Sequence, residues 1–133
     1  MTIPPEILDF VASEETYPDK SVIVQEGGRG EWVYIILEGQ VKIRKRTAKG
    51  MLTIETLGPG EYVGELSLLN SKSTSRPLAA VAHGPVLLGT LDSARLSHEW
   101  GVQPVELRKL MVALMTDLEE TSKELVTLVE KTQ

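Results

Sequence analysis

Residues 57–69 combine a glycine-rich turn, a carboxylate and a segment that fits one helical turn. A Gly58-Pro59-Gly60 turn ends an apolar run, and Gly64 then allows a ligand to approach the backbone closely. The next residues, 65–69, fit one short helical turn, whose free N–H groups suit an anion such as a phosphate. Glu65 would accept hydrogen bonds from a pair of ligand hydroxyl groups.

A polar, hydroxyl-rich stretch follows at residues 70–77 and contains Arg76 near its end. A guanidinium group binds phosphate through two parallel hydrogen bonds, so Arg76 is a candidate anion ligand. The same residues also fit a simpler interpretation, a capped turn followed by a solvated loop. The residues by themselves leave both interpretations open.

The first two-thirds of the chain would form the elements that position these residues, a short helix followed by strands. In residues 1–14, Pro4 and Pro5 suit a helix start and the apolar residues fall at helical spacing, which predicts a short N-terminal helix. Residues 15–92 are short apolar or alternating runs separated by glycine-containing turns, typical of an antiparallel sandwich, jelly roll or barrel. The predicted strands are 21–25, 32–38, 41–46, 51–57, 78–82 and 86–91.

The last third of the chain, residues 93–133, changes to a helical period. Asp92 or Ser93 would cap a short helix, which Gly101 ends. Pro104 then starts a longer helix near its first turn. The sequence therefore predicts a β-domain followed by a short and a long helix.

The long helix, residues 104–131, carries a seam with a heptad repeat. Its length, about 42 Å at 1.5 Å per residue, exceeds what covering a small β-domain requires. We therefore favour a parallel homodimeric coiled coil over an amphipathic helix packed on its own barrel. The seam residues, at alternating steps of four and three, are Leu107, Met111, Leu114, Leu118, Thr121, Leu125 and Leu128, with Thr121 a polar break.

Two further motifs carry a family resemblance. The first is Ile23-Val24-Gln25-Glu26-Gly27, Gly30, Val33-Tyr34-Ile35-Ile36 and Gly39, and the second is Val63-Gly64-Glu65-Leu66-Ser67-Leu68-Leu69. Together they make the chain similar to the cyclic nucleotide-binding domain, the sensory module of catabolite activator proteins, protein kinase A regulatory subunits and cyclic-nucleotide-gated channels. The first motif resembles the opening strands, with Gly28 in place of a polar residue, and the second resembles the start of the phosphate-binding cassette.

The resemblance implies one domain over residues 1–133. Residues 15–92 would form an antiparallel β-roll of the jelly-roll or double-stranded β-helix type, mainly β with flanking helices, with its cassette at 58–81. The ligand would be a cyclic nucleotide, cAMP or cGMP with cAMP preferred, bound without catalysis and without a cofactor. Its binding would be signalled through the C-terminal helices and the dimer to an unidentified protein effector.

The resemblance also assigns roles to single residues. Glu65 would bind the ribose 2′-hydroxyl, and Arg76 the cyclic phosphate. Thr121 and Ser122 on the long helix would reach the base of the nucleotide in a dimer, with Thr116 as the second choice. The remaining expected ligand-binding residues are Val63, Gly64, Leu66, Ser67, Ser75 and Pro77, of which Gly64, Leu66 and Ser67 would contribute backbone contacts.

The end of the cassette departs from the family pattern of Arg, small, Ala, any, Val. This chain reads Arg76-Pro77-Leu78-Ala79-Ala80-Val81, so Pro77 either takes the arginine position or follows Arg76 without an N–H to donate. Losing one hydrogen bond to a charged group, about 1.5–3 kcal/mol, weakens binding roughly ten- to 150-fold. The alternative function is therefore a degenerate dimerisation or protein-interaction module of the same fold, ligand-free or differently liganded.

Composition excludes other classes of function. The chain has 133 residues and no cysteine, which excludes disulfides and thiolate catalysis, and it contains no membrane-length apolar run. A net charge of −5 and the lack of a helix-turn-helix segment argue against direct DNA binding. His83 and His98 lack metal-ligand spacing. We expect a cytoplasmic protein that is not an enzyme.

One charged segment remains unassigned, a basic hairpin within residues 42–49. It is either a solvated, charge-protected strand edge or a docking site for a partner or an acidic surface. Its cations are Lys42, Arg44, Lys45, Arg46 and Lys49.

Overall fold

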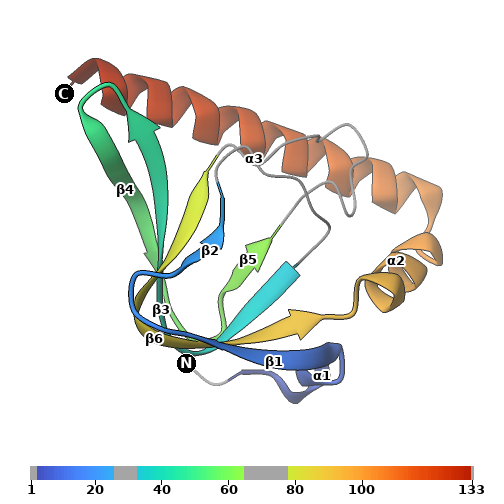
Figure 1. Cartoon of the computed structure of the whole chain (residues 1–133). Helices are drawn as coiled ribbons and strands as arrows, with labels where there is room; N and C mark the ends of the chain where they lie inside the picture. The colour runs from blue at the N-terminus through green and yellow to red at the C-terminus, as the bar shows by residue number, and fades with distance from the viewer. Residues whose placement is uncertain (1–2, 26–32, 65–77, 133) are drawn as a thin grey trace.

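The computed structural model describes residues 3–25, 33–64 and 78–132, and at positions 119, 122, 123, 126, 129, 130 and 132 it describes the backbone alone. A strongly curved β-sheet is followed by two helices, the longer of which crosses the top of the view in Figure 1. The helices are α1 (Pro5–Leu8), α2 (Ser93–Gly101) and α3 (Val105–Thr132). The strands are β1 (Val11–Tyr17), β2 (Val22–Val24), β3 (Val33–Thr47), β4 (Gly50–Leu57), β5 (Tyr62–Gly64) and β6 (Ala79–Leu91).

All strand pairs of the described sheet are antiparallel. The main path is β1-β6-β3-β4, and β2 pairs with β6 while β5 pairs with β3. The two long strands β3 and β6 run together from Tyr34 opposite Thr90 to Arg44 opposite Ala79. The prediction of a mainly antiparallel β fold with flanking helices is therefore confirmed.

The glycine-containing turns predicted between strands 32–38 and 41–46 and between strands 78–82 and 86–91 are bends inside β3 and β6, not chain reversals. Gly39 and Gly84 have φ values of +90° and +77°, a region that favours glycine. The pairing of β3 with β6 shifts register between Ile36 and Gln40, so both strands turn a corner without separating. Pairing between the two strands continues beyond the corner, which keeps each one continuous.

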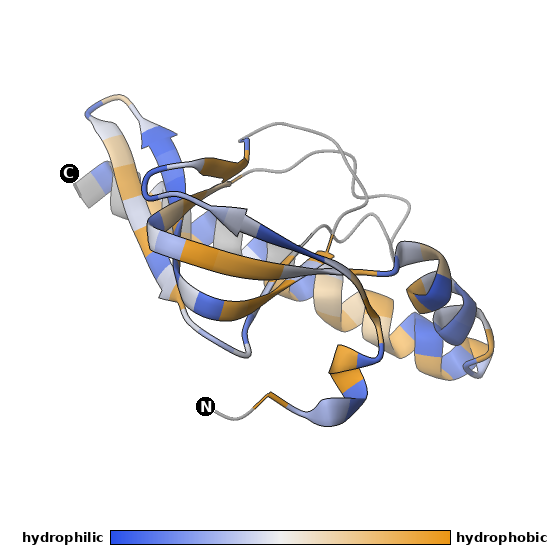
Figure 2. Ribbon diagram, turned by 60° about the horizontal axis from the view of Figure 1, so that its bottom comes forward, coloured by the Kyte–Doolittle hydropathy of each residue, from blue (hydrophilic) through white to orange (hydrophobic). Residues whose placement is uncertain are grey.

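The core lies inside the curve of the sheet and comes mainly from β3 and β6. Its fully buried side chains are Ile35, Ile36, Val41 and Leu88. Small residues on β6, among them Ala80 and Ala82, let the sheet close tightly over these branched side chains. Figure 2 shows hydrophobic and hydrophilic stretches along the strands. The adjacent residues Ile35 and Ile36 are both fully buried, so β3 is covered on both faces there.

The predicted N-terminal helix over 1–14 is wrong beyond Leu8. The helix α1 ends there, and residues 11–17 form β1, which pairs with β6 from Val11 opposite Leu91 to Tyr17 opposite Val86. Pairing with a buried strand outweighs the weak helical spacing of the short apolar residues in this segment. The structure thus adds a strand that the sequence pattern did not indicate.

The two C-terminal helices form where the sequence predicts them. The Asp92 carboxylate caps α2 by accepting a hydrogen bond from the Arg95 backbone N–H at 3.1 Å. Arg95 also ties α2 to the N-terminal segment, because its Nη1 donates to the Asp9 carbonyl at 2.6 Å and its guanidinium lies 4.3 Å from the centre of the Phe10 ring. The helix α2 is therefore anchored to the start of β1.

The apolar seam of α3 is solvent-exposed, from 39% at Met111 to 68% at Leu118. Thr121, in the same seam, is exposed too. In the part of the chain that the structure describes, the seam therefore does not pack on its own barrel. None of the described helices combines the length and apolarity that crossing a membrane requires.

Candidate ligand site

Within the predicted cassette, residues 58–81, the strand β5 fixes the point at which the chain enters segment 65–77. Val33, Tyr34 and Ile35 of β3 lie opposite Gly64, Val63 and Tyr62. The Val63 side chain is buried in the core, so Gly64 is held at a defined place at the end of β5. A mobile loop would offer no such fixed starting point for backbone contacts to a ligand.

The turn before β5 is itself held by hydrogen bonds. The Gly58 backbone N–H donates to the Glu61 carboxylate at 2.6 Å, and the Glu61 N–H donates to the Gly58 carbonyl at 3.1 Å. Gly60 donates to the Ile36 carbonyl at 2.8 Å and has a φ of +87°, which explains why glycine occupies this position. Glu61 thus shapes the turn, and its carboxylate is engaged there.

The chain leaves segment 65–77 on an equally well-anchored strand, β6. Ala79 and Ala80, at the start of β6, are buried and pair with Arg44 and Ile43 of β3. Both ends of segment 65–77 are therefore attached to the same long strand, β3. The two described positions between which segment 65–77 runs are thus fixed by the same strand.

The structure describes only part of the predicted ligand set. Val63 is a core residue, Gly64 ends β5, and Thr121 lies exposed in the α3 seam. Ser122 lies in α3, where the backbone alone is described. The other predicted residues, Glu65, Leu66, Ser67, Ser75, Arg76 and Pro77, lie outside the described residues, and their roles remain predictions.

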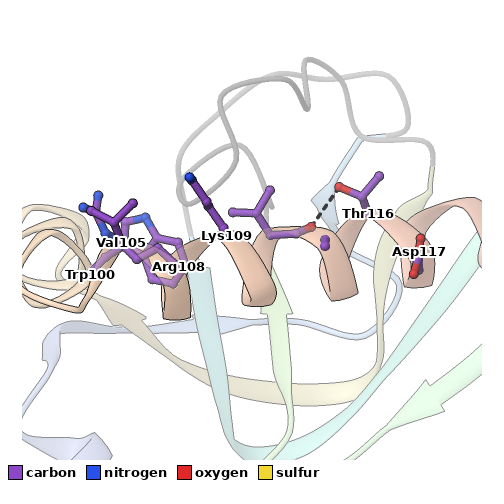
Figure 3. Close-up of a pocket in the computed structure, with 8 residues that line it drawn as sticks. Trp100, Val105, Arg108, Lys109, Thr116 and Asp117 are labelled. Atoms are coloured by element: carbon purple, nitrogen blue, oxygen red, sulfur yellow. Dashed lines mark hydrogen bonds between the residues drawn. The ribbon is translucent and has the colours of Figure 1, made fainter.

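A cavity of about 570 Å³ lies against α2 and the N-terminal half of α3. This volume falls within the usual range for small-molecule sites. The lining side chains belong to a face of α3 different from the seam, with Val105, Arg108, Val112 and Thr116 at helical spacing (Figure 3). The complete described lining is Trp100, Val105, Arg108, Lys109, Val112, Ala113, Thr116 and Asp117.

Two hydrogen bonds order the walls of this cavity. The Thr116 hydroxyl donates to the Val112 carbonyl at 2.9 Å, shown as the dashed line in Figure 3. The Arg108 Nε donates to the Gln103 carbonyl at 3.2 Å, which holds the guanidinium near the α2–α3 junction. Apolar walls with a few charged and hydroxyl groups suit a planar ring with polar edges.

Of the residues around this cavity, the sequence pattern predicts only Thr116, as the second choice for a contact with the base. It gives no indication of Arg108, Lys109 or Asp117. The signal was a second periodic face on the long helix, at steps of three and four beside the seam. The more regular apolar seam hid this face.

Comparison with known proteins identifies the fold family. The sequence pattern of the cyclic nucleotide-binding domain matches residues 14–98. The chain belongs to the cyclic nucleotide-binding domain family. The matched region runs from β1 into α2, so it includes the whole predicted cassette, residues 58–81.

The relatives of this cyclic nucleotide-binding domain include regulatory proteins of two kinds. A cAMP-dependent protein kinase regulatory subunit of Mycosarcoma maydis is 34% identical over 80 residues, which are 60% of this chain and 14% of that protein. A cyclic AMP receptor protein of Thermus thermophilus is 33% identical over 81 residues, 58% of this chain and 38% of that protein. The domain thus spans well under half the length of these relatives.

Solved structures extend the likeness in fold. The cAMP-bound form of the EAL enzyme Bd1971 superimposes with a TM-score of 0.77 at 23% identity, over 86% of this chain and 30% of that one. The regulatory subunit of a cAMP-independent protein kinase A of Trypanosoma cruzi, bound to guanosine, gives 0.54 at 32% identity, over 61% of this chain and 28% of that one. The same fold therefore accompanies different ligands.

Proposed function

We propose that this chain is a regulatory module that binds a cyclic nucleotide, cAMP before cGMP, without catalysing a reaction. The observation that carries the proposal is the family match over residues 14–98, which contains the whole cassette. The names of two relatives point to cAMP as the ligand. The non-catalytic role is that of a kinase regulatory subunit such as the first of them.

In this proposal Glu65 binds the ribose 2′-hydroxyl and Arg76 the cyclic phosphate. Gly64, Leu66 and Ser67 contribute backbone groups, and Val63, Ser75 and Pro77 flank them. The fixed strand ends at Gly64 and Ala79 favour this role, because they hold the borders of the binding loop on β3.

The nucleotide signal would pass through α2 and α3 to a homodimer and then to a protein effector. Two copies would pair through the α3 seam, whose leucines are exposed in the single chain. Exposed leucines at heptad spacing favour a parallel coiled coil. A ligand acts on such an assembly only through its different affinity for two arrangements of the helices. Direct DNA binding and membrane insertion are not part of the proposal.

Thermal unfolding with increasing cAMP, and separately cGMP, tests ligand binding. A ligand at about 100 times its dissociation constant stabilises the folded state by roughly 2.7 kcal/mol, a shift of several degrees. We expect a saturable shift that Glu65→Ala and Arg76→Ala each remove. Glu55→Ala, at an exposed carboxylate on β4, is the matched control and should keep the shift. No shift with millimolar nucleotide would refute the proposal.

A second candidate function is supported by the Arg76-Pro77 sequence. A site with a weakened phosphate contact would favour a ligand without phosphate, and one relative of this fold, named cAMP-independent, has guanosine bound. Titration with guanosine and adenosine distinguishes this candidate. A shift with nucleosides and none with cyclic nucleotides would favour it, and a shift with neither would leave a ligand-free dimerisation module.

A further inference from the structure

The cavity beside α2 and α3 lies on a side of α3 that the predicted nucleotide contact Thr121 does not share. Thr121 follows the cavity residue Thr116 by five positions, which is about 140° around an α-helix. Thr121 is exposed in the seam, whereas Thr116 is half-buried and lines the cavity. A ligand in this cavity would therefore lie on a different side of α3 from a nucleotide that contacts the seam.

The middle of the cavity is apolar and leaves room for a flat ring system. Val112 is half-buried in its wall, and Ala113 beside it has the smallest side chain of the described lining. Trp100 of α2 and Val105 of α3 lie at one end, as Figure 3 shows. Aromatic rings pack favourably against such aliphatic and indole surfaces. The walls thus suit an aromatic ligand.

Two cations line the cavity near Trp100. The Arg108 guanidinium is oriented by its Nε, which donates to the Gln103 carbonyl at 3.2 Å. Its two terminal nitrogens have no hydrogen-bond partner among the described residues, so both are available to an anion. Lys109 forms a weak ion pair with Glu106, at 3.6 Å between side chains that are 70% and 87% exposed. A guanidinium beside an ammonium favours a carboxylate at this end.

The opposite end of the cavity is acidic. Asp117 lies there, nine residues after Arg108 and therefore about 13.5 Å further along the helix axis. Its carboxylate is exposed and accepts hydrogen bonds from a hydroxyl or amine group. The Thr116 hydroxyl next to it donates to the Val112 carbonyl at 2.9 Å. The cavity therefore has a cationic end, an apolar middle and an anionic end.

We propose that this cavity is a second small-molecule site, for a flat aromatic carboxylate of two fused rings with a hydroxyl or amine at its far end. The carboxylate binds Arg108 and Lys109. The rings lie against Trp100 and Val112, and the distal donor binds Asp117. Because the lining joins α2 to α3, the ligand favours the arrangement of the two helices that keeps the cavity open. The site stands whether or not the chain binds a nucleotide.

Calorimetric titration of the whole chain with 6-hydroxy-2-naphthoate tests the site, because this probe is a flat carboxylate with a hydroxyl at the opposite end. We expect one molecule bound per chain, and binding at least tenfold weaker in Arg108→Met/Lys109→Met and in Ala113→Phe. Lys49→Met, an exposed cation in the β3–β4 turn, is the matched control and should bind like the unaltered chain. For the unaltered chain, 2-naphthol, which lacks the carboxylate, should bind at least tenfold more weakly, a comparison that needs no variant to fold.

Asp117→Asn tests the opposite end of the cavity. It should weaken binding of 6-hydroxy-2-naphthoate at least fivefold and leave binding of 2-naphthoate, which has no hydroxyl, unchanged. An equal loss for both probes would refute the contact between the ligand hydroxyl and Asp117.

Three other outcomes overturn the proposal. No binding at millimolar probe would mean that the cavity takes no such ligand. Binding that neither Arg108→Met/Lys109→Met nor Ala113→Phe weakens would place the probe elsewhere on the chain, the exposed seam included. Competitive displacement of the probe by cAMP would make the cavity part of the nucleotide site and not a second site.

Discussion

A Cβ atom built on Gly39 would lie 2.4 Å from the Pro85 carbonyl oxygen. This close approach joins the two corners of the roll, since Gly39 bends β3 and Pro85 follows the bend in β6. At this point the backbones of β3 and β6 lie too close together for a side chain on Gly39, so the bend in β3 depends on the bend in β6.

Gly39→Ala should therefore destabilise the fold by about 2–4 kcal/mol, from the positive φ and from displaced backbone together. Gly84→Ala is the matched control, because it shares a positive φ, +77°, and meets nothing within 4 Å. It should cost only about 1–2 kcal/mol. Urea unfolding of both variants measures the difference. Equal losses would mean that the contact with Pro85 has no energetic effect.

Arg95→Ala should lower the free energy of unfolding by about 1–2 kcal/mol, because it removes a hydrogen bond to the Asp9 carbonyl and a cation–π contact with Phe10. Glu99→Ala, at an exposed position on the same helix, should change it by less than about 0.5 kcal/mol. Chemical denaturation reports both values. An unchanged midpoint for the arginine variant would show that α2 needs no such anchor.

Leu118→Glu should convert a dimer to a monomer, since a charge in the seam opposes helix pairing. The thermal midpoint of the monomer should hardly change, because this leucine is 68% exposed in the single chain. Val102→Glu replaces a valine that is 62% exposed outside α3 and should leave the dimer intact. Light scattering gives the mass in each case, and a dimeric Leu118→Glu protein would contradict the seam interpretation.

Ala113→Phe should fill part of the cavity beside α3 and lower cAMP affinity at least tenfold if the nucleotide extends into it. Thr121→Val tests the seam position instead and should matter only in the dimer. Calorimetric titration above and below the dimer dissociation constant separates the two effects. Unchanged affinity for the phenylalanine variant would place the ligand away from this cavity.

Burial, together with a hydrogen bond to Glu15, raises the pKa of Tyr17 above its ordinary value of about 10. The folded state then holds this proton more tightly than the unfolded state, so the stabilisation is present below pH 10 and is lost as the pH rises above it. Tyr17→Phe should lose less stability than the unaltered protein between pH 9 and pH 11. Tyr62→Phe, at a half-exposed tyrosine, is the control and should follow the unaltered protein.

The sequence predicts those elements that are specified by short-range signals, such as a helix cap or a repeat of apolar residues. The helix α2 has its cap at Asp92, and the seam of α3 repeats regularly, so both helices follow from short-range patterns. The residues of β1 lacked such a signal because Val11 to Tyr17 become a strand only by pairing with β6. Likewise, Gly39 and Gly84 indicated a change of direction, but whether they reverse a strand or bend it depends on the strand alongside.

The candidate site divides in the same way. The motif alone places Val63 and Gly64 within the cassette, and β5 confirms their position as the residues that lead into segment 65–77. The cavity residues Arg108 and Asp117 could not be predicted from the sequence. Their face of α3 lines a cavity only because of where α2 and the rest of the fold lie. No local pattern records which face of a long helix borders a hollow.

The anchoring of α2 by Arg95 has a mechanical consequence for α3. One helix is clamped to the edge of the sheet, and the next projects from a short junction at Val102–Pro104 as a rod of 28 residues. At about 1.5 Å per residue, a rotation of about 10° at that junction would sweep the far end of the rod through about 7 Å. The junction is thus the fulcrum of a lever, and a small rotation there is amplified into a displacement of several ångströms at the C-terminal end of α3.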